Sequence, residues 1–245
     1  MARLSVNLNK VALLRNSRRT GVPDLARFAR IALASGAEGL TVHPRPDERH
    51  IRGSDIPLLT AAMAGKRPAM EFNIEGYPDD RLLEILREAR PEQCTLVPDA
   101  PDAFTSEEGW KLDPEQMAIA QASIAEIQAI GCRVVLFIDP DPAVPARVRE
   151  SGADGVEIYT GAYAEAFRHG RHAPILAAIA ATARAAESLG LVVNAGHDLN
   201  LLNIPALIEA VPFLAEASIG HELTADALEM GFSATVAAYA AALRG

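Results

Sequence analysis

Cysteine is scarce in this sequence, which narrows the chemistry that the chain can carry. The 245 residues include only Cys94 and Cys132, whose separation fits no metal-binding motif. Both stand in apolar, strand-like runs, so we expect buried free thiols in a reducing cytosol.

Long apolar runs are also missing. The first residues, MARLSVNLNKVALLRN, lack the uninterrupted apolar stretch of a secretory signal. No window reaches the roughly 18 apolar residues of a membrane span. We therefore predict a cytoplasmic protein with no membrane partner.

Positive charge is in short supply. Lys and Arg number 23 against 32 Asp and Glu, which gives a formal net charge of -9 and a pI near 5.2. Because binding to a nucleic acid backbone needs a broad basic surface, no nucleic acid partner is expected. A few arginines focused in one cleft could still bind a small phosphorylated metabolite.

The sequence does contain a regular alternation of strand-like and helical segments. The strand-like runs are mostly apolar with little strict alternation, which is typical of parallel strands covered on both faces. There are eight of these runs: 3–9, 39–45, 68–74, 93–99, 133–139, 155–161, 191–197 and 213–221.

Amphipathic helices are predicted between these runs from apolar residues at three- and four-residue spacing. Asp79 and Asp113 are candidate N-caps, and Gly36, Gly131 and Gly190 fall at the expected C-terminal glycine position. The clearest helical segments are 24–36, 79–90, 114–131 and 173–190.

Eight strand–helix units in 245 residues predict an α/β fold with a single (β/α)8 TIM barrel. A doubly wound sheet rarely needs so many regular units. No linker or composition shift marks a second domain, so residues 1–245 are expected to form one domain. The longest irregular segment, 98–114, is expected to be an ordered loop with a functional part.

The C-terminal ends of the strands, where such barrels place their active sites, are unusually polar here. Four of the six histidines fall at or just after these ends, which indicates one shared site. The polar residues and glycines at or just after the expected ends are Asn7, Asn9, His43, Arg45, His50, Glu71, Asn73, Asp139, Glu157, Tyr159, His197, Gly220 and His221.

Two carboxylates, Glu71 and Glu157, stand inside apolar runs. Burial would raise the pKa of such a group and suit it to general acid or base catalysis near neutral pH. A structural ion pair with an arginine inside the barrel is the alternative for both residues, and the sequence leaves it open.

Phosphate binding is indicated by arginines and by glycine-containing loops. Guanidinium groups fit phosphate oxygens, and the loops 194–203 and 218–221 follow the last two strands, where barrels often bind phosphate through backbone N–H groups. The arginines that follow the first two strands are Arg15, Arg18, Arg19, Arg45, Arg49 and Arg52.

These motifs together resemble the pyridoxine 5′-phosphate synthase family of deoxyxylulose-5-phosphate-dependent vitamin B6 biosynthesis. The most specific are TVHPRPDERHI and VNAGHDL. The segments that carry the resemblance run in order from residue 6 to residue 221 and are VNLN, LLRNSR, GLTVHPRPDERHI, the glutamate of AMEFNI, LVPD followed by TSEEGW, LFID, IYTGAYA, NAGHDLN and SIGH.

The resemblance implies a (β/α)8 barrel with additional helices and a homo-octameric assembly. It implies acid/base condensation of 1-deoxy-D-xylulose 5-phosphate with 3-amino-2-oxopropyl phosphate, which yields pyridoxine 5′-phosphate, inorganic phosphate and water. It implies no metal and no organic cofactor.

Carried over position by position, the resemblance makes His43 and Glu71 proton acceptors and His197 the proton donor. The substrate contacts that it implies are Arg45, His50 and Thr105 for the deoxyxylulose phosphate, Asn7 and Arg18 for the aminoketone phosphate, and Gly196, Gly220 and His221 for phosphate on the rim.

The chain departs from the family pattern in two places. Where many members read N-x-D-H after the first strand, it has Asn7, Asn9 and Lys10, and Tyr159 replaces a histidine after the glutamate of the sixth strand. Asn9 is retained as an expected substrate contact, and Lys10 can supply positive charge. A variant branch of the family and a shifted substrate both fit these changes.

Two other functions remain open from the residues alone. A metal-dependent sugar-phosphate isomerase or epimerase would use Glu71, Asp139, Glu157 and a histidine as ligands, although H-x-H and E-x-x-H spacings are missing. A non-catalytic barrel that only binds a phosphorylated metabolite is the second. Three titratable groups at the rim argue against mere binding.

Overall fold

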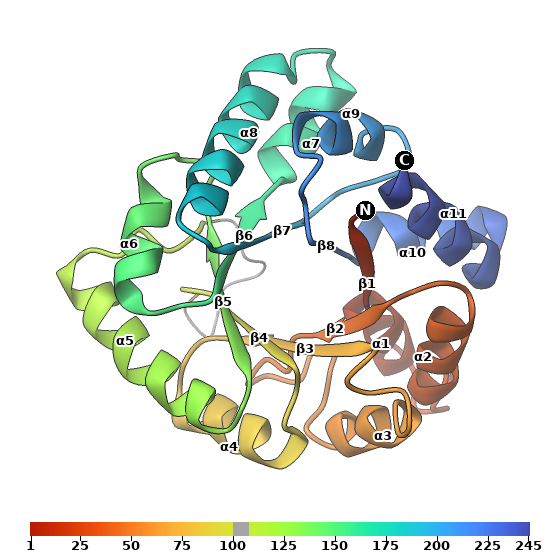
Figure 1. Ribbon diagram of the computed structural model, residues 1–245. Coiled ribbons are helices and arrows are strands. Elements are labelled where there is room, and N and C mark those ends of the chain that lie inside the picture. The colour runs from red at the N-terminus through yellow and green to blue at the C-terminus, as the bar shows by residue number, and fades with distance from the viewer. Residues whose placement is uncertain (100–107) are drawn as a thin grey trace.

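The strands close into a parallel barrel in which each strand pairs with its neighbours in the sequence, as Figure 1 shows. The computed structural model describes residues 1–99 and 108–245. The predicted TIM barrel is therefore confirmed. The strands are β1 (Arg3–Asn7), β2 (Gly39–Val42), β3 (Glu71–Gly76), β4 (Gln93–Leu96), β5 (Arg133–Ile138), β6 (Gly155–Tyr159), β7 (Val192–Gly196) and β8 (Glu216–Ile219).

Helices surround the barrel (Figure 1). The β1–β2 and β6–β7 connections carry two helices each, and two more follow β8. The last helix, α11, packs against β1, α2, α9 and α10. The additional helices that the resemblance implied are present. The helices are α1 (Asn9–Asn16), α2 (Leu25–Ala34), α3 (Asp55–Ala62), α4 (Asp80–Ala89), α5 (Pro114–Ala129), α6 (Val144–Ser151), α7 (Gly161–Arg168), α8 (Ala173–Ser188), α9 (Ile204–Ala210), α10 (His221–Met230) and α11 (Phe232–Arg244).

Helix ends follow the predicted capping chemistry. The side chain of Asp79 accepts a hydrogen bond from Leu82 N at 2.7 Å, and Asp113 accepts one from Gln116 N at 2.9 Å. Each such cap contributes about 0.5–2 kcal/mol. The predicted C-terminal glycines all adopt positive φ: Gly36, Gly131 and Gly190.

The barrel wall has an apolar outer face and a polar inner face. Leu40, Phe72 and similar side chains belong to the buried apolar core, whereas polar side chains hydrogen-bond across the interior. The sequence predicted mostly apolar strands with little strict alternation. The structure corrects this, because strand side chains alternate between the two faces and many of the inward ones are polar. The interior bonds include Ser5 Oγ with Thr41 Oγ1 at 2.7 Å, Thr95 Oγ1 to Asn73 Oδ1 at 3.2 Å and Asn194 Nδ2 to Gln93 Oε1 at 3.1 Å.

Cys94 and Cys132 are buried free thiols, as predicted. Burial raises the pKa of Cys132 to about 12 and raises that of Cys94 as well. Because the thiolate is the reactive form, both residues serve packing.

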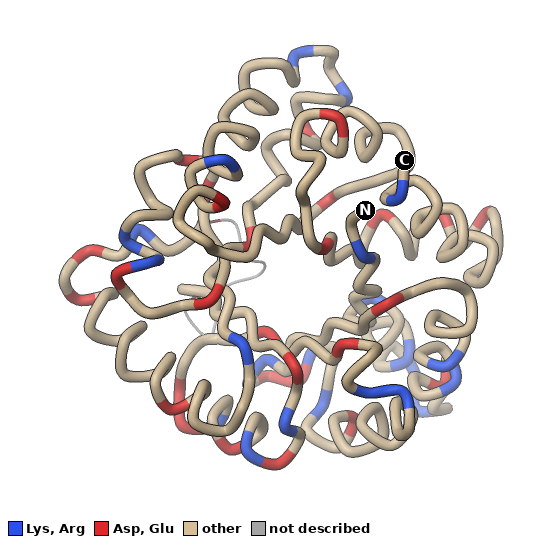
Figure 2. The backbone as a smooth tube through the Cα atoms, in the orientation of Figure 1, with Lys and Arg blue, Asp and Glu red and all other residues tan. Residues whose placement is uncertain are grey.

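The outer helices carry charges of both signs. Figure 2 shows acidic and basic residues interspersed around the outer ring of helices. None of the helices in residues 1–99 and 108–245 has the length and hydropathy needed to cross a membrane.

Candidate active site

A cavity of about 500 Å³ opens at the C-terminal ends of the strands, where the sequence predicted the active site. Side chains from β1, β3, β6 and β8 meet in it with residues of α1, α7 and α10 and of the segments that follow β2 and β7. The residues that line it are Asn7, Asn9, Lys10, Leu13, His43, Arg45, Arg49, His50, Glu75, Glu157, Tyr159, Arg168, His197, Asp198, Ser218, Gly220, His221 and Glu222.

Eight of the twelve predicted site residues line this cavity. Of the others, Arg18 is exposed, Gly196 is buried and Glu71 lies elsewhere in the barrel, and none of these three belongs to the lining. Thr105 falls outside the described residues. The predicted residues that the structure brings together are Asn7, Asn9, His43, Arg45, His50, His197, Gly220 and His221.

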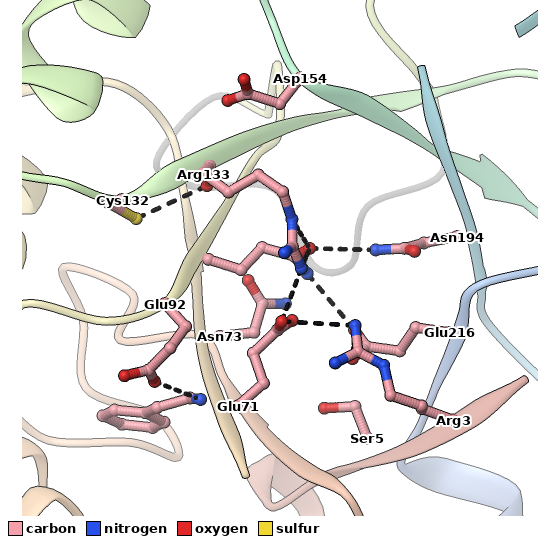
Figure 3. Close-up of polar contacts among 12 residues, drawn as sticks. Arg3, Ser5, Glu71, Asn73, Glu92, Cys132, Arg133, Asp154, Asn194 and Glu216 are labelled. Atoms are coloured by element: carbon pink, nitrogen blue, oxygen red, sulfur yellow. Dashed lines mark hydrogen bonds and ion pairs between the residues drawn. The ribbon is translucent and has the colours of Figure 1, made fainter. Parts of the chain in front are cut away.

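The sequence placed Glu71 at the C-terminal end of the third strand, and the structure corrects this position, because Glu71 opens β3 and so lies at the opposite end of the barrel. Figure 3 shows its carboxylate facing Arg3 and Arg133, with Oε2 at 3.4 Å and 2.6 Å from their NH2 atoms. Burial and the nearby Glu71 carboxylate raise the pKa of Glu216 to about 8. Glu71 therefore forms the structural ion pair with arginine that the sequence left open as an alternative.

The misplacement has a physical cause in the boundaries of the third strand. The apolar pattern predicted a strand over 68–74, whereas β3 covers Glu71–Gly76. Since Glu75 is charged, the pattern ended the strand before it. With strand alternation, Glu71, Asn73 and Glu75 share one face, and only Glu75 reaches the C-terminal end.

Glu75 is the carboxylate that the sequence interpretation missed. Its Oε2 atom lies 3.8 Å from His43 Nδ1 and 3.5 Å from Asn7 Nδ2. Burial raises the pKa of Glu75 to about 7, although the Arg45 guanidinium opposes the shift. A carboxylate with this pKa can exchange protons near neutral pH.

His43 follows the end of β2 and is buried beside Glu75. Its backbone N–H donates to Asn9 Oδ1 at 2.9 Å, so the asparagine that departs from the family pattern anchors this strand end. Burial lowers the pKa of His43 well below its ordinary value, and Arg45 and neighbouring cations add to the effect. The imidazole is therefore neutral at neutral pH and can accept a proton.

Cations converge on His50 at one side of the cavity. Burial lowers the pKa of His50 to about 4, with further contributions from Arg45, Arg49 and Lys10. Arg45 is buried and forms an ion pair with Asp99 at 2.9 Å. This concentration of positive charge in a net acidic protein suits a substrate phosphate group.

The loop that carries His50 is tied to α1 by a buried ion pair. Arg15 NH1 and NH2 bind Asp55 Oδ1 and Oδ2 at 2.5 Å and 2.9 Å, and the same guanidinium donates to His50 O at 3.1 Å. Asn16 Nδ2 donates to His50 O at 2.8 Å. These contacts fix the backbone beside the cations.

Replacing Asp55 with alanine is expected to lower the free energy of unfolding by about 3–5 kcal/mol, because it leaves the buried Arg15 cation without its partner. The side chain of Asp55 is only 3% exposed. Urea unfolding at a fixed protein concentration measures the change. Asp47→Ala is the matched control, since the Asp47 carboxylate is 47% exposed beside Arg49 and should change stability by less than about 1 kcal/mol. Equal losses in the two variants would contradict the structural role of the buried pair.

Glu157 lines the cavity and is buried, which favours its protonated form. Burial raises its pKa well above the ordinary value, and Glu75 and Glu216 add to the shift. Thr95 Oγ1 is 3.4 Å from Glu157 Oε2. A side chain at position 196 would overlap Glu157 Oε1, so Gly196 makes room for this carboxyl group. No arginine within residues 1–99 and 108–245 pairs with Glu157, so the ion-pair alternative fails for it.

The start of α10 also lines the cavity. Gly220 is its N-cap and His221 its first residue. The first N–H groups of a helix have no partner within the helix and favour anions. A Cβ atom at Gly220 would lie 3.0 Å from Asn7 Cβ, so glycine permits β8 to approach β1 closely.

The barrel and its rim of buried acid and base groups beside cations define a TIM-barrel enzyme. Its family follows from comparison with known proteins. The chain belongs to the family described as Pyridoxal phosphate biosynthesis protein PdxJ, whose model matches residues 4–245. This confirms the family that the motifs predicted.

Relatives from several bacteria carry the name Pyridoxine 5'-phosphate synthase. One from Allorhizobium ampelinum is 51% identical over 96% of this chain and 95% of its own length. One from a Chelativorans species is 50% identical over 98% of each chain. These matches support the synthase function and neither of the two alternatives.

Solved structures with low sequence identity share the fold alone. Thiamine phosphate pyrophosphorylase from Pyrococcus furiosus has a TM-score of 0.60 at 10% identity and covers 99% of this chain and 95% of its own. A phosphoribosylanthranilate isomerase from Thermotoga maritima has a TM-score of 0.59 at 10% identity, with full coverage of both chains.

Proposed function

We propose that this enzyme condenses 1-deoxy-D-xylulose 5-phosphate with 3-amino-2-oxopropyl phosphate to give pyridoxine 5′-phosphate, inorganic phosphate and water. The observation that carries the proposal is the pair of His43 and Glu75, 3.8 Å apart in a cavity that also contains a cluster of cations. The family resemblance of the motifs supplies the two substrates.

The two proton acceptors are His43 and Glu75. Ring closure requires imine formation, loss of one phosphate, dehydration and aromatisation, and each of these steps moves protons. A neutral imidazole and a carboxylate with a pKa of about 7 can both take up protons near neutral pH. Their burial keeps water away from the reacting atoms.

His197 is proposed as the proton donor. Burial lowers its pKa in the free protein, so it needs a nearby anion to become protonated. A dianionic substrate phosphate would provide one, because a neighbouring negative charge favours the imidazolium form. The buried Glu157 carboxyl group in the same cavity, whose pKa is raised, is proposed as a second donor.

The substrate phosphate groups are proposed to bind at separate sets of residues. Arg45 and His50, with Lys10 nearby, would hold the deoxyxylulose phosphate. Asn7 and Arg18 would hold the aminoketone phosphate, and Gly220 and His221, at the start of α10, would hold phosphate on the rim. The further proposed contacts of this site are Asn9, Thr105 and Gly196.

The function is tested by product identification. Purified protein is incubated with both substrates, with and without a chelator, and pyridoxine 5′-phosphate and inorganic phosphate are quantified. Chelator-resistant formation of both products in equal amounts is expected. If both substrates bind and neither product forms, the proposed reaction is wrong.

We also propose a cytoplasmic homo-octamer without metal or organic cofactor, which the resemblance implies. Light scattering should give a mass eight times the 26.1 kDa of one chain. A monomer at working concentrations would contradict the assembly but not the reaction.

The rate should rise with pH through the pKa of Glu75, which is about 7. Glu75 accepts protons only when ionised, so kcat/KM should increase about tenfold per pH unit below that pKa and level off above it. His43 is already neutral in this range, because its pKa is lowered. A profile that is flat from about pH 6 to pH 8 would contradict the role of Glu75.

A further inference from the structure

Three rings from consecutive strands meet at His197. The imidazole centroid lies 5.3 Å from the Tyr159 ring at an interplanar angle of 76° and 5.4 Å from the Phe137 ring at 49°. The two flanking rings contact each other edge to face at 5.6 Å. Such tilted contacts are the favoured geometries of aromatic pairs, so these rings form a wall with a defined shape against the imidazole.

The backbone at His197 has an unusual conformation that hydrogen bonds from Thr160 hold in place. His197 adopts a φ of 81°, a conformation that is rare outside glycine. The hydroxyl of Thr160, the residue after Tyr159, lies 2.6 Å from His197 O and 2.5 Å from Gly196 O. Thr160 therefore ties the end of β6 to the strained residue that follows β7.

The ring of Tyr159 occupies a space that the chain keeps open for it. A Cβ atom at Gly161 would overlap the Tyr159 hydroxyl and ring, so the glycine that begins α7 leaves room for them. Tyr159 also pairs in register with Gly196, directly before His197. The start of α7 and the end of β7 therefore fix the position of the Tyr159 ring beside the imidazole.

A carboxylate partner often orients a catalytic histidine. In the described part of the chain, no Asp or Glu forms an ion pair with this ring, although His43 has Glu75 in that position. Within residues 1–99 and 108–245, the ring contacts of this imidazole are those with Phe137 and Tyr159.

We infer that Tyr159 is a positioning residue for His197, and that its ring, backed by Phe137, holds the imidazole in the orientation that faces the cavity. The inference rests on the proposed function, in which His197 is the proton donor. It assigns a role to one of the residues that depart from the family pattern. Where the family has a histidine, this chain uses a larger ring to form one side of the wall.

The first test follows His197 by NMR in the free protein, without substrates. In the wild type, burial lowers the pKa of His197 below its ordinary value. Tyr159→Ala should raise this pKa toward the ordinary value, since water replaces the ring. Tyr159→Phe should leave it near the wild-type value. The charged and titratable groups near the ring, which both variants retain, are Asp99, Asp198, Lys10, Arg45 and His43.

Assignment and folding are checked in the same spectra. His197→Gln identifies the resonance by its loss. His169 and His172, which lie away from the cavity, should keep their chemical shifts in a folded variant. If the Ala and Phe variants titrate alike while these resonances are unchanged, Tyr159 does not position His197.

The second test compares the kinetics of the two variants. Tyr159→Ala should have a kcat on the order of 10- to 100-fold below that of Tyr159→Phe, with KM for both substrates within about threefold, because a misplaced catalytic group slows chemistry more than binding. Equal kcat values would overturn the inference. A shifted His197 titration in a protein that forms no product would uphold the positioning role and overturn the proposed function.

Discussion

Glu75→Gln is expected to reduce kcat for pyridoxine 5′-phosphate formation by about 10²–10⁴-fold, the usual effect of removing a general base. Glutamine keeps the size of the side chain and can still contact Asn7, but it cannot accept a proton from the substrate. KM should change little, because the proposed phosphate contacts lie elsewhere in the cavity. Steady-state kinetics at saturating concentrations of both substrates measure the effect.

Glu71→Gln is the matched control for this variant. It makes the same chemical change four residues earlier on the same face of β3, at the opposite end of the barrel, where Glu71 binds Arg3 and Arg133. Its kcat should stay within about threefold of the wild-type value, although its stability should fall because a buried ion pair is disrupted. A large loss of activity in Glu71→Gln with normal activity in Glu75→Gln would reverse the assignment.

His43→Ala should cause a loss of kcat of similar size, and its combination with Glu75→Gln should not be multiplicative. The Nδ1 atom of His43 is 3.8 Å from Glu75 Oε2, and both groups are proposed to accept protons in one site. Residues that act as a unit show strongly non-additive effects, so the double variant should be about as slow as the slower single variant. A double-mutant cycle measures this coupling.

The opposite result in that cycle is equally informative. If the two losses multiply, His43 and Glu75 act in separate proton transfers. The proposed function would still hold, but the two residues would not act together in one step. An unchanged rate in His43→Ala would remove this residue from the mechanism.

The fold was predictable because its signals are local and repeated. Each apolar run marks a strand, and caps such as Asp79 and Asp113 mark helix starts through bonds to neighbouring backbone N–H groups. The order of elements then leaves a parallel barrel as the natural arrangement. The polar interior was not predictable from apolar runs, since it depends on which alternate residues face inward.

Site residues were predictable from the sequence where they directly follow the end of a strand. His43, Arg45 and His197 were found because they follow strand ends, and all three line the cavity. Glu75 was missed because a charged residue inside a strand looks like the end of that strand. In a barrel, however, a carboxylate that points inward near the rim can belong both to the strand and to the site, as Glu75 does.

Other features of the site required the folded structure. Asn9 anchors His43 through a bond between segments 34 residues apart, and no local pattern shows that contact. The pKa directions of Glu75 and His43 depend on burial and on charges from other strands. Arg18 is exposed in the structure, so its proposed contact with a substrate phosphate remains a prediction.

A crystal structure of the protein with 1-deoxy-D-xylulose 5-phosphate bound tests the proposed function most directly. The sugar phosphate is expected in the cavity at the C-terminal ends of the strands, with its phosphate against Arg45 and His50 and its carbon chain beside Glu75 and His43. A ligand bound at the other end of the barrel, beside Glu71, Arg3 and Arg133, would contradict it.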